Sequence, residues 1–136
     1  MKIVIIEDEA FAARRLENLV KDYNPQFQIV AWLESVQDSI EWFSQNTHPD
    51  LIFLDIHLED DLSFAIFNKV TVTCPIVFTT ATDELAVKAF VTKGIDYLHK
   101  PIVQDELNKM LDKYSSGDFP QRIIDAQYFN DLFNTK

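Results

Sequence analysis

The chain has 136 residues, of which 47% are hydrophobic, and carries a formal net charge of -10 with a pI of about 4.5. This length predicts one domain with a short extension, and the negative charge argues against direct binding to nucleic acid or an anionic membrane. The two glycines are too few for a phosphate-binding loop of the P-loop or dinucleotide type, because those loops need several for close backbone approach.

Short apolar runs alternate along the chain with segments of helical periodicity. The expected strands cover residues 2–6, 27–33, 51–54, 76–79 and 95–98. Between them, apolar residues recur at three- and four-residue spacing, around 13–23, 36–43, 85–90 and 107–111. Five βα units ending near Tyr114 predict an α/β fold of the doubly wound, flavodoxin-like type. Its parallel sheet has five strands in the order 2-1-3-4-5, with helices on both faces.

The last twenty residues read differently from the rest of the chain. The stretch "SSGDFP" (115–120) is typical of a linker, and an amphipathic helix of about four turns is predicted after it. Its apolar residues form two columns at four-residue spacing: Ile124, Tyr128 and Leu132, then Phe129 and Phe133. We therefore divide the chain into a domain at 1–116 and a linker with C-terminal helix at 117–136. This helix either leads to an output domain or ends a single-domain protein, and the sequence leaves both open.

Acidic residues stand where two predicted strands end. Glu7 and Asp8 follow the first strand, and Asp55 closes the third. Ligands of open parallel sheets bind at the carboxyl ends of the strands where the strand order reverses, which here lies between strands 1 and 3. We therefore expect the three carboxylates to share one pocket. Their mutual repulsion calls for a divalent cation, and an all-oxygen set favours Mg²⁺ or Mn²⁺ over zinc. For Glu9, Glu59 and Asp60 we favour the simpler reading, as acids at strand ends and helix N-termini.

Two later strands end at the same predicted edge. One finishes in Thr80 and the other leads into Lys100. Either residue alone would be an ordinary strand or surface residue, but together they add a hydroxyl and an ammonium group to the carboxylates. Such a site suits phosphoryl transfer to a side chain, and Asp55 is the best nucleophile because a buried strand holds it at the pocket centre.

Residues 1 to about 114 resemble the receiver domain of a bacterial two-component response regulator. The resemblance rests on an ordered set of residues: Glu7-Asp8, Asp55, Thr80-Ala81, Tyr97 and Lys100-Pro101. Several longer stretches resemble the LytTR-type branch, whose regulators carry a DNA-binding domain after the receiver: "PDLIFLDIHL", "SFAIF", "PIVFTTATDE", "AVKAF" and "IDYLHKPI".

The resemblance implies a role for each residue of the site. Asp55 would take a phosphoryl group from a sensor histidine kinase. Asp8, Asp55 and the backbone carbonyl of His57 would hold Mg²⁺, with Glu7 binding it through water. Lys100 would pair with the phosphoryl group, and its peptide bond to Pro101 would be cis. No other cofactor is implied, and the protein would be a regulator that catalyses only its own phosphorylation and dephosphorylation.

The resemblance also implies how the signal leaves the site. Thr80 would move to hydrogen-bond the phosphoryl oxygen, and Tyr97 would rotate inward behind it, since phosphorylation adds charge and acceptors. We expect a homodimer on activation and transcriptional control through a domain beyond Lys136. The chain itself, with 12 basic and 22 acidic residues, should not bind DNA. One position departs from the pattern: relatives usually have glycine where this chain has Asp61.

Two other function classes were weighed. A Mg²⁺-dependent phosphatase with an aspartyl-phosphate intermediate commonly has a second Asp two residues after the nucleophile, where this chain has His57. A flavodoxin-like FMN binder would place its phosphate against the acidic turn after strand 1, which would repel it. The single cysteine, Cys74, cannot form an internal disulfide. The N-terminal apolar run is too short for a signal peptide or a membrane span, and we therefore expect a cytoplasmic protein.

Overall fold

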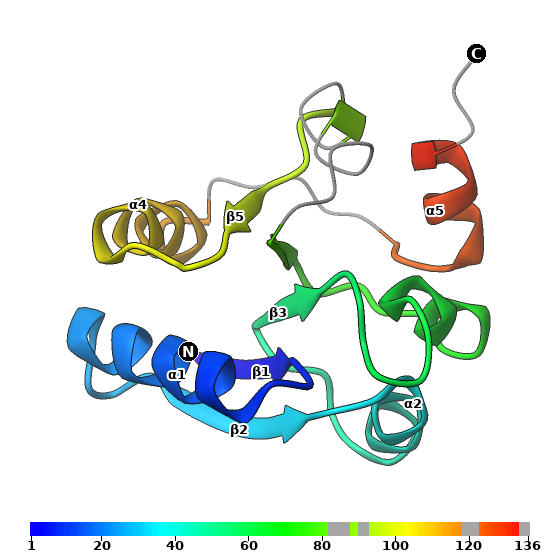
Figure 1. Cartoon of the computed structure of the whole chain (residues 1–136), viewed down its shortest axis with the longest axis horizontal. Helices are drawn as coiled ribbons and strands as arrows, with labels where there is room; N and C mark the ends of the chain where they lie inside the picture. The colour runs from blue at the N-terminus through cyan, green and yellow to red at the C-terminus, as the bar shows by residue number, and fades with distance from the viewer. Residues whose placement is uncertain (82–87, 90–92, 118–122, 134–136) are drawn as a thin grey trace.

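The computed structural model describes residues 1–81, 88–89, 93–117 and 123–133, and its centre is a five-stranded parallel sheet. The strand order is β2-β1-β3-β4-β5, which confirms the predicted doubly wound fold (Figure 1). The strands are β1 (Lys2–Ile6), β2 (Gln28–Leu33), β3 (Leu51–Asp55), β4 (Ile76–Thr80) and β5 (Tyr97–His99). Each boundary lies within two residues of the prediction.

Two apolar clusters cover the two faces of the sheet. Because successive strand residues point to opposite faces, Ile3 and Ile5 enter one cluster and Val4 and Ile6 the other. The first cluster packs under α1 (Ala10–Tyr23) and α4 (Gln104–Ser115). The second packs under α2 (Val36–Gln45) and η1 (Ser63–Asn68), on the opposite side in Figure 1. Since β1 and β3 lie in the middle of the sheet, their ends are the most rigidly held.

One helical segment of the structure was not predicted from the sequence. A short 3-10 helix, η1, connects β3 to β4, where the sequence shows no helical pattern. Six residues are too few for the three- and four-residue spacing to repeat, so the segment gives no periodic signal. The helical pattern predicted at 85–90 falls mostly outside the described residues.

The C-terminal segment does not form the predicted four-turn helix. Helix α5 (Ala126–Phe133) has eight residues. The Asp125 carboxylate accepts a hydrogen bond from the Tyr128 amide (3.1 Å), which fixes the start of the helix after Ile124. Ile124, assigned to the helical column, instead pairs with Val72 in an antiparallel bridge, with N···O distances of 2.9 and 2.7 Å. Tyr128 packs against the core, and the side chain of Leu132 lies outside the described residues.

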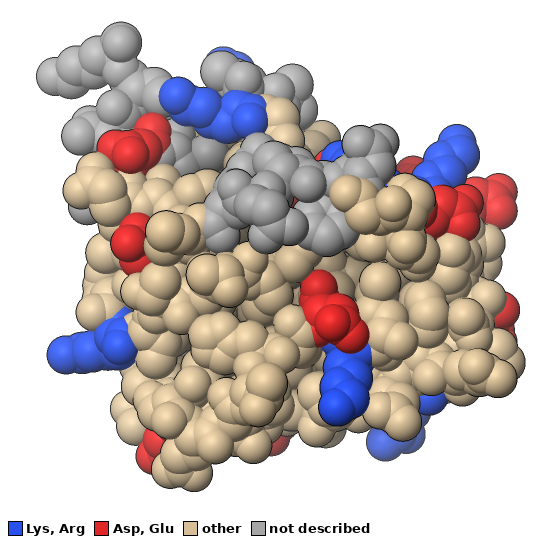
Figure 2. All heavy atoms as spheres, turned by 180° about the vertical axis from the view of Figure 1, so that it is seen from behind, with Lys and Arg blue, Asp and Glu red and all other residues tan. Residues whose placement is uncertain are grey.

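The surface view agrees with the charge argument from the sequence. In Figure 2, Lys and Arg side chains stand apart from one another among acids and uncharged residues. Among the described residues on this face, the basic side chains form no continuous patch. Within the described ranges, no helix has both the length and the apolar character needed to cross a membrane.

Candidate functional site: an acidic pocket at the carboxyl edge of the sheet

The fold brings together the three carboxylates predicted to be neighbours. Glu7 directly follows β1 and Asp55 is the last residue of β3, two strands that pair side by side. One carboxylate oxygen each from Glu7, Asp8 and Asp55 lies within 4.8 Å of the others. Glu7 and Asp55 are only 4% and 7% exposed. Three carboxylates this close together, two of them buried, need positive charge to offset their repulsion.

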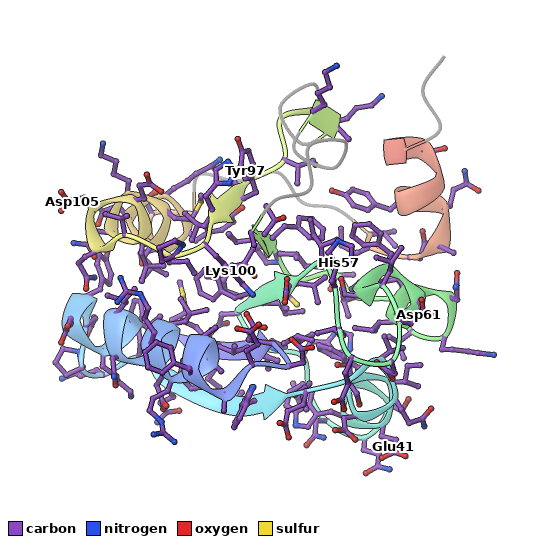
Figure 3. The ribbon with its side chains drawn as sticks, viewed as in Figure 1. Glu41, His57, Asp61, Tyr97, Lys100 and Asp105 are labelled. Atoms are coloured by element: carbon purple, nitrogen blue, oxygen red, sulfur yellow. The ribbon has the colours of Figure 1, made fainter. Side chains whose placement is uncertain are left out.

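Lys100 supplies part of that charge. Its ammonium group lies 3.0 Å from Asp55 Oδ2 and also forms an ion pair with Glu7 Oε1. The Lys100 amide donates to the Thr80 carbonyl (2.9 Å), and the Lys100–Pro101 peptide is cis, as the resemblance implied. In Figure 3, Lys100 points toward the ends of β1 and β3, whereas Tyr97 lies farther out on β5. One lysine serves two carboxylates, so the site remains net negative.

The pKa of Glu7 reflects this excess of negative charge. The pKa of Glu7 is raised to about 7, chiefly because the carboxyl is buried; the hydrogen bond from Lys100 lowers it and the neighbouring Asp55 carboxylate adds to the rise. Burial alone would lower the pKa of Lys100, but the contacts with Glu7 and Asp55 outweigh it and the pKa rises. The set of hard oxygen donors, short of one or two positive charges, fits Mg²⁺ or Mn²⁺.

Thr80 ends β4 at the same edge and is 1% exposed. Its hydroxyl has no hydrogen-bond partner anywhere in the part of the chain that the structure describes. A buried hydroxyl without a partner is costly, and such groups are uncommon in folded proteins. Tyr97 is half-buried on β5, with its ring 5.3 Å from the ring of His99 in an edge-on arrangement.

The loop after Asp55 closes on itself. The Ser63 amide donates to the Ile56 carbonyl (2.8 Å), and His57 forms an antiparallel bridge with Leu62. No described residue other than glycine has a positive φ, so Asp61 occupies the usual glycine position without a left-handed backbone. Its carboxylate instead accepts a hydrogen bond from the Leu62 amide (2.7 Å). The departure from the family pattern therefore introduces no backbone strain.

The remaining acids do not join the pocket. Glu9 and Glu59 are exposed, and Asp60 contacts backbone amides of α2 instead, as the simpler reading favoured. A hollow of about 320 Å³ lies beside the site, between α1 and residues 100–102, and no sequence pattern indicates it. Its walls are mostly apolar and include Ile5, Phe11, Leu16, Phe53, Pro101 and Ile102. Sequence patterns locate the ends of strands but not spaces between side chains.

Residues 3–112 match the family described as "Response regulator receiver domain". The chain belongs to this family. It is 37% identical over 118 residues to the sensory transduction protein LytT of Enterococcus faecalis, an alignment covering 85% of this chain and 48% of LytT. It is 34% identical over 116 residues to LytR of Staphylococcus epidermidis, covering 83% of this chain and 45% of LytR. Both relatives are LytTR-type regulators, which confirms the predicted branch.

Solved structures agree with this assignment. The response regulatory domain of mrkE from Klebsiella pneumoniae matches with a TM-score of 0.70 and 33% identity, covering 86% of this chain and 97% of that domain. A two-component response regulator from Clostridium difficile matches with a TM-score of 0.69 and 27% identity, covering 85% and 96%. This receiver domain is thus a phospho-accepting signalling switch, and the chain spans about half the length of the curated relatives it matches.

Proposed function

We propose that Asp55 is the residue that accepts the phosphoryl group. The observation that carries this assignment is the position of its carboxylate, which ends a central strand 3.0 Å from the Lys100 ammonium group. A carboxylate oxygen attacks phosphorus while the bond from phosphorus to the donor nitrogen or oxygen breaks, and the donor atom keeps the electron pair. Lys100 neutralises charge on the phosphoryl oxygens as the new bond forms.

Asp8, Asp55 and the backbone carbonyl of His57 are the proposed ligands of the metal, with Glu7 binding it through water. The support is the 4.8 Å grouping of the three carboxylates and their excess negative charge. A bound Mg²⁺ would shield the carboxylates from the incoming phosphoryl oxygens. At this site the protein catalyses only its own phosphorylation and the later hydrolysis of the aspartyl phosphate.

Thr80 and Tyr97 are proposed to carry the signal outward. The unpartnered hydroxyl of Thr80, already at the carboxyl edge, gains an acceptor when a phosphoryl oxygen arrives. Tyr97 stands one strand farther out, since Thr80 and His99 are paired residues of β4 and β5. A shift of Thr80 toward the phosphoryl group therefore frees space next to the β5 aromatic residues.

The proposed partners follow from this chemistry. A sensor histidine kinase in the cytoplasm donates the phosphoryl group, activation promotes a homodimer, and any DNA contact belongs to a domain beyond Lys136. Residues 117–136 form the mechanical link to that domain. This proposal is supported by two contacts with the receiver: Ile124 pairs with Val72, and α5 contacts η1.

The test of the phosphoacceptor is intact-mass analysis after incubation with a small phosphodonor and Mg²⁺. Wild type should gain one phosphoryl group, and Asp55→Asn should gain none. Asp61→Asn is the matched control, because it removes a nearby exposed carboxylate charge and keeps an oxygen for the Leu62 amide. Uptake by Asp55→Asn at the wild-type rate would refute the assignment.

A further inference from the structure

Asp60 makes an unusual pair of contacts for a loop residue. Its Oδ1 accepts a hydrogen bond from the Val36 amide (2.9 Å) and its Oδ2 accepts one from the Gln37 amide (3.2 Å). These amides belong to the first turn of α2, where backbone N–H groups lack partners within the helix. Burial acts to raise the pKa of Asp60, but the backbone hydrogen bonds outweigh it and lower the pKa. The loop after β3 is therefore fastened to α2 by an ionised carboxylate.

Fastening Asp60 also fixes the backbone around His57. The loop is closed at its base by the Ser63–Ile56 hydrogen bond and across its middle by the His57–Leu62 bridge. The Leu58 amide donates to the Asp61 carbonyl at 3.0 Å, which ties the residue after His57 to the residue after Asp60. A loop with these internal bonds moves as a unit, so a tether at one residue restrains its neighbours.

The segment where β2 ends and α2 begins also contacts the turn after β1, which carries Glu7 and Asp8. The Glu7 amide donates to the Leu33 carbonyl (2.9 Å), and Trp32 Nε1 donates to the Glu7 carbonyl (2.7 Å). Residues 32–37 thus contact the turn after β1 on one side and the loop after β3 on the other. Both groups of proposed metal ligands are attached to one short segment of backbone.

We propose that Asp60 is a positioning residue for the metal site, which acts by holding the His57 carbonyl at a fixed distance from Asp8 and Asp55 through its tether to α2. The inference rests on the proposed function of the site. Asp60 is not among the three carboxylates grouped within 4.8 Å of one another, and its oxygens accept hydrogen bonds from the amides of α2 instead. Groups that hydrogen-bond directly to metal ligands commonly change metal affinity by 10- to 100-fold when they are removed. Because Asp60 acts through the loop backbone, we expect the lower end of that range.

The test compares Asp60→Ala with Glu59→Gln, which removes an equal charge from the adjacent, exposed position. Mg²⁺ affinity is measured by calorimetry and by tryptophan fluorescence, since Trp32 donates a hydrogen bond to the Glu7 carbonyl. Asp60→Ala should raise the Kd for Mg²⁺ by about tenfold, with phosphoryl uptake recovering at saturating Mg²⁺. Glu59→Gln should change the Kd by less than about twofold, because an exposed charge at this distance is screened by salt.

A third variant separates positioning from folding. Asp60→Asn keeps an oxygen for one of the two amides, so its Kd should lie between those of wild type and Asp60→Ala. Equal Kd values for Asp60→Ala and Glu59→Gln would overturn the inference, as would a lower melting temperature with an unchanged Kd. If wild type binds no Mg²⁺ at all, the proposed metal site fails. If wild type binds Mg²⁺ and Asp60→Ala binds it equally well, only the positioning role fails.

Discussion

Replacing Lys100 by methionine removes the cation shared by two buried carboxylates and keeps a side chain of similar length. Glu7 and Asp55 would then face each other without a positive charge in the apo protein. Breaking a buried ion pair by removing one partner costs about 3–5 kcal/mol. Because 19% of the Lys100 side chain remains exposed, we expect the lower end, about 3 kcal/mol at pH 8.

The size of this loss should depend on pH. The folded-state pKa of Glu7, about 7, exceeds its ordinary value of 4.5, so the folded state holds more protons than the unfolded state between these pH values. Stability from this group therefore falls as the pH rises through that window. Losing the hydrogen bond from Lys100 raises the pKa of Glu7 further and extends the window above pH 7. The difference between wild type and Lys100→Met should be smaller at pH 5.5, where Glu7 is protonated in both proteins.

Thermal unfolding in EDTA is the assay. For a chain of this size 1 kcal/mol corresponds to about 4 °C, so Lys100→Met should melt about 12 °C lower at pH 8. Added Mg²⁺ should raise its melting temperature more than that of wild type, because the metal replaces the missing positive charge. Lys113→Met is the control, since it breaks a more exposed pair with Asp96 (2.8 Å) and should cost under about 1 kcal/mol. A loss equal to that of the control at pH 8, or one that grows toward pH 5.5, would refute this reasoning.

Four further outcomes are expected. Thr80→Val should leave the apo melting temperature, measured by calorimetry, unchanged or higher, because the buried hydroxyl has no partner among the described residues. Beryllofluoride, which stands in for the phosphoryl group, should increase dimer formation in wild type but not in Thr80→Val, as measured by sedimentation. Stabilisation by Mg²⁺ should be larger at pH 8 than at pH 5.5, since Glu7 must lose its proton to assist, and a thermal-shift titration at both pH values would show it. Cys74, buried beside Ile124, should react slowly with a thiol reagent and faster in Ile124→Asp, so equal rates would contradict docking of the C-terminal segment. Fluorescence anisotropy with DNA at low salt should show no micromolar, salt-sensitive binding by this chain.

The strands and the pocket were predictable because each strand is an apolar run that ends in a functional residue. Asp55 and Glu7 reach the same edge of the sheet because β1 and β3 are neighbours, and the strand order of doubly wound folds predicts that β1 and β3 pair. The contact of Asp60 with α2 was not predictable, because its partners stand more than twenty residues away and any acid in that loop gives the same local pattern. Ile124 was misassigned for the same reason: its spacing to Tyr128 fits a helix, whereas its partner, Val72, lies far away in the sequence.

The bridge between Val72 and Ile124 has a consequence for how the chain assembles. The two residues are 52 positions apart, so their pairing needs a large loop to close and follows formation of the segment around Val72. Two backbone hydrogen bonds and one short helix hold this segment, whereas β1 and β3 are each paired with a strand on both sides. We therefore expect residues 123–133 to open as a separate cooperative unit, at a lower free energy than β1 or β3. In native-state hydrogen exchange, the Ile124 amide would exchange through local opening, whereas the Ile5 and Ile52 amides would exchange only when the whole domain unfolds.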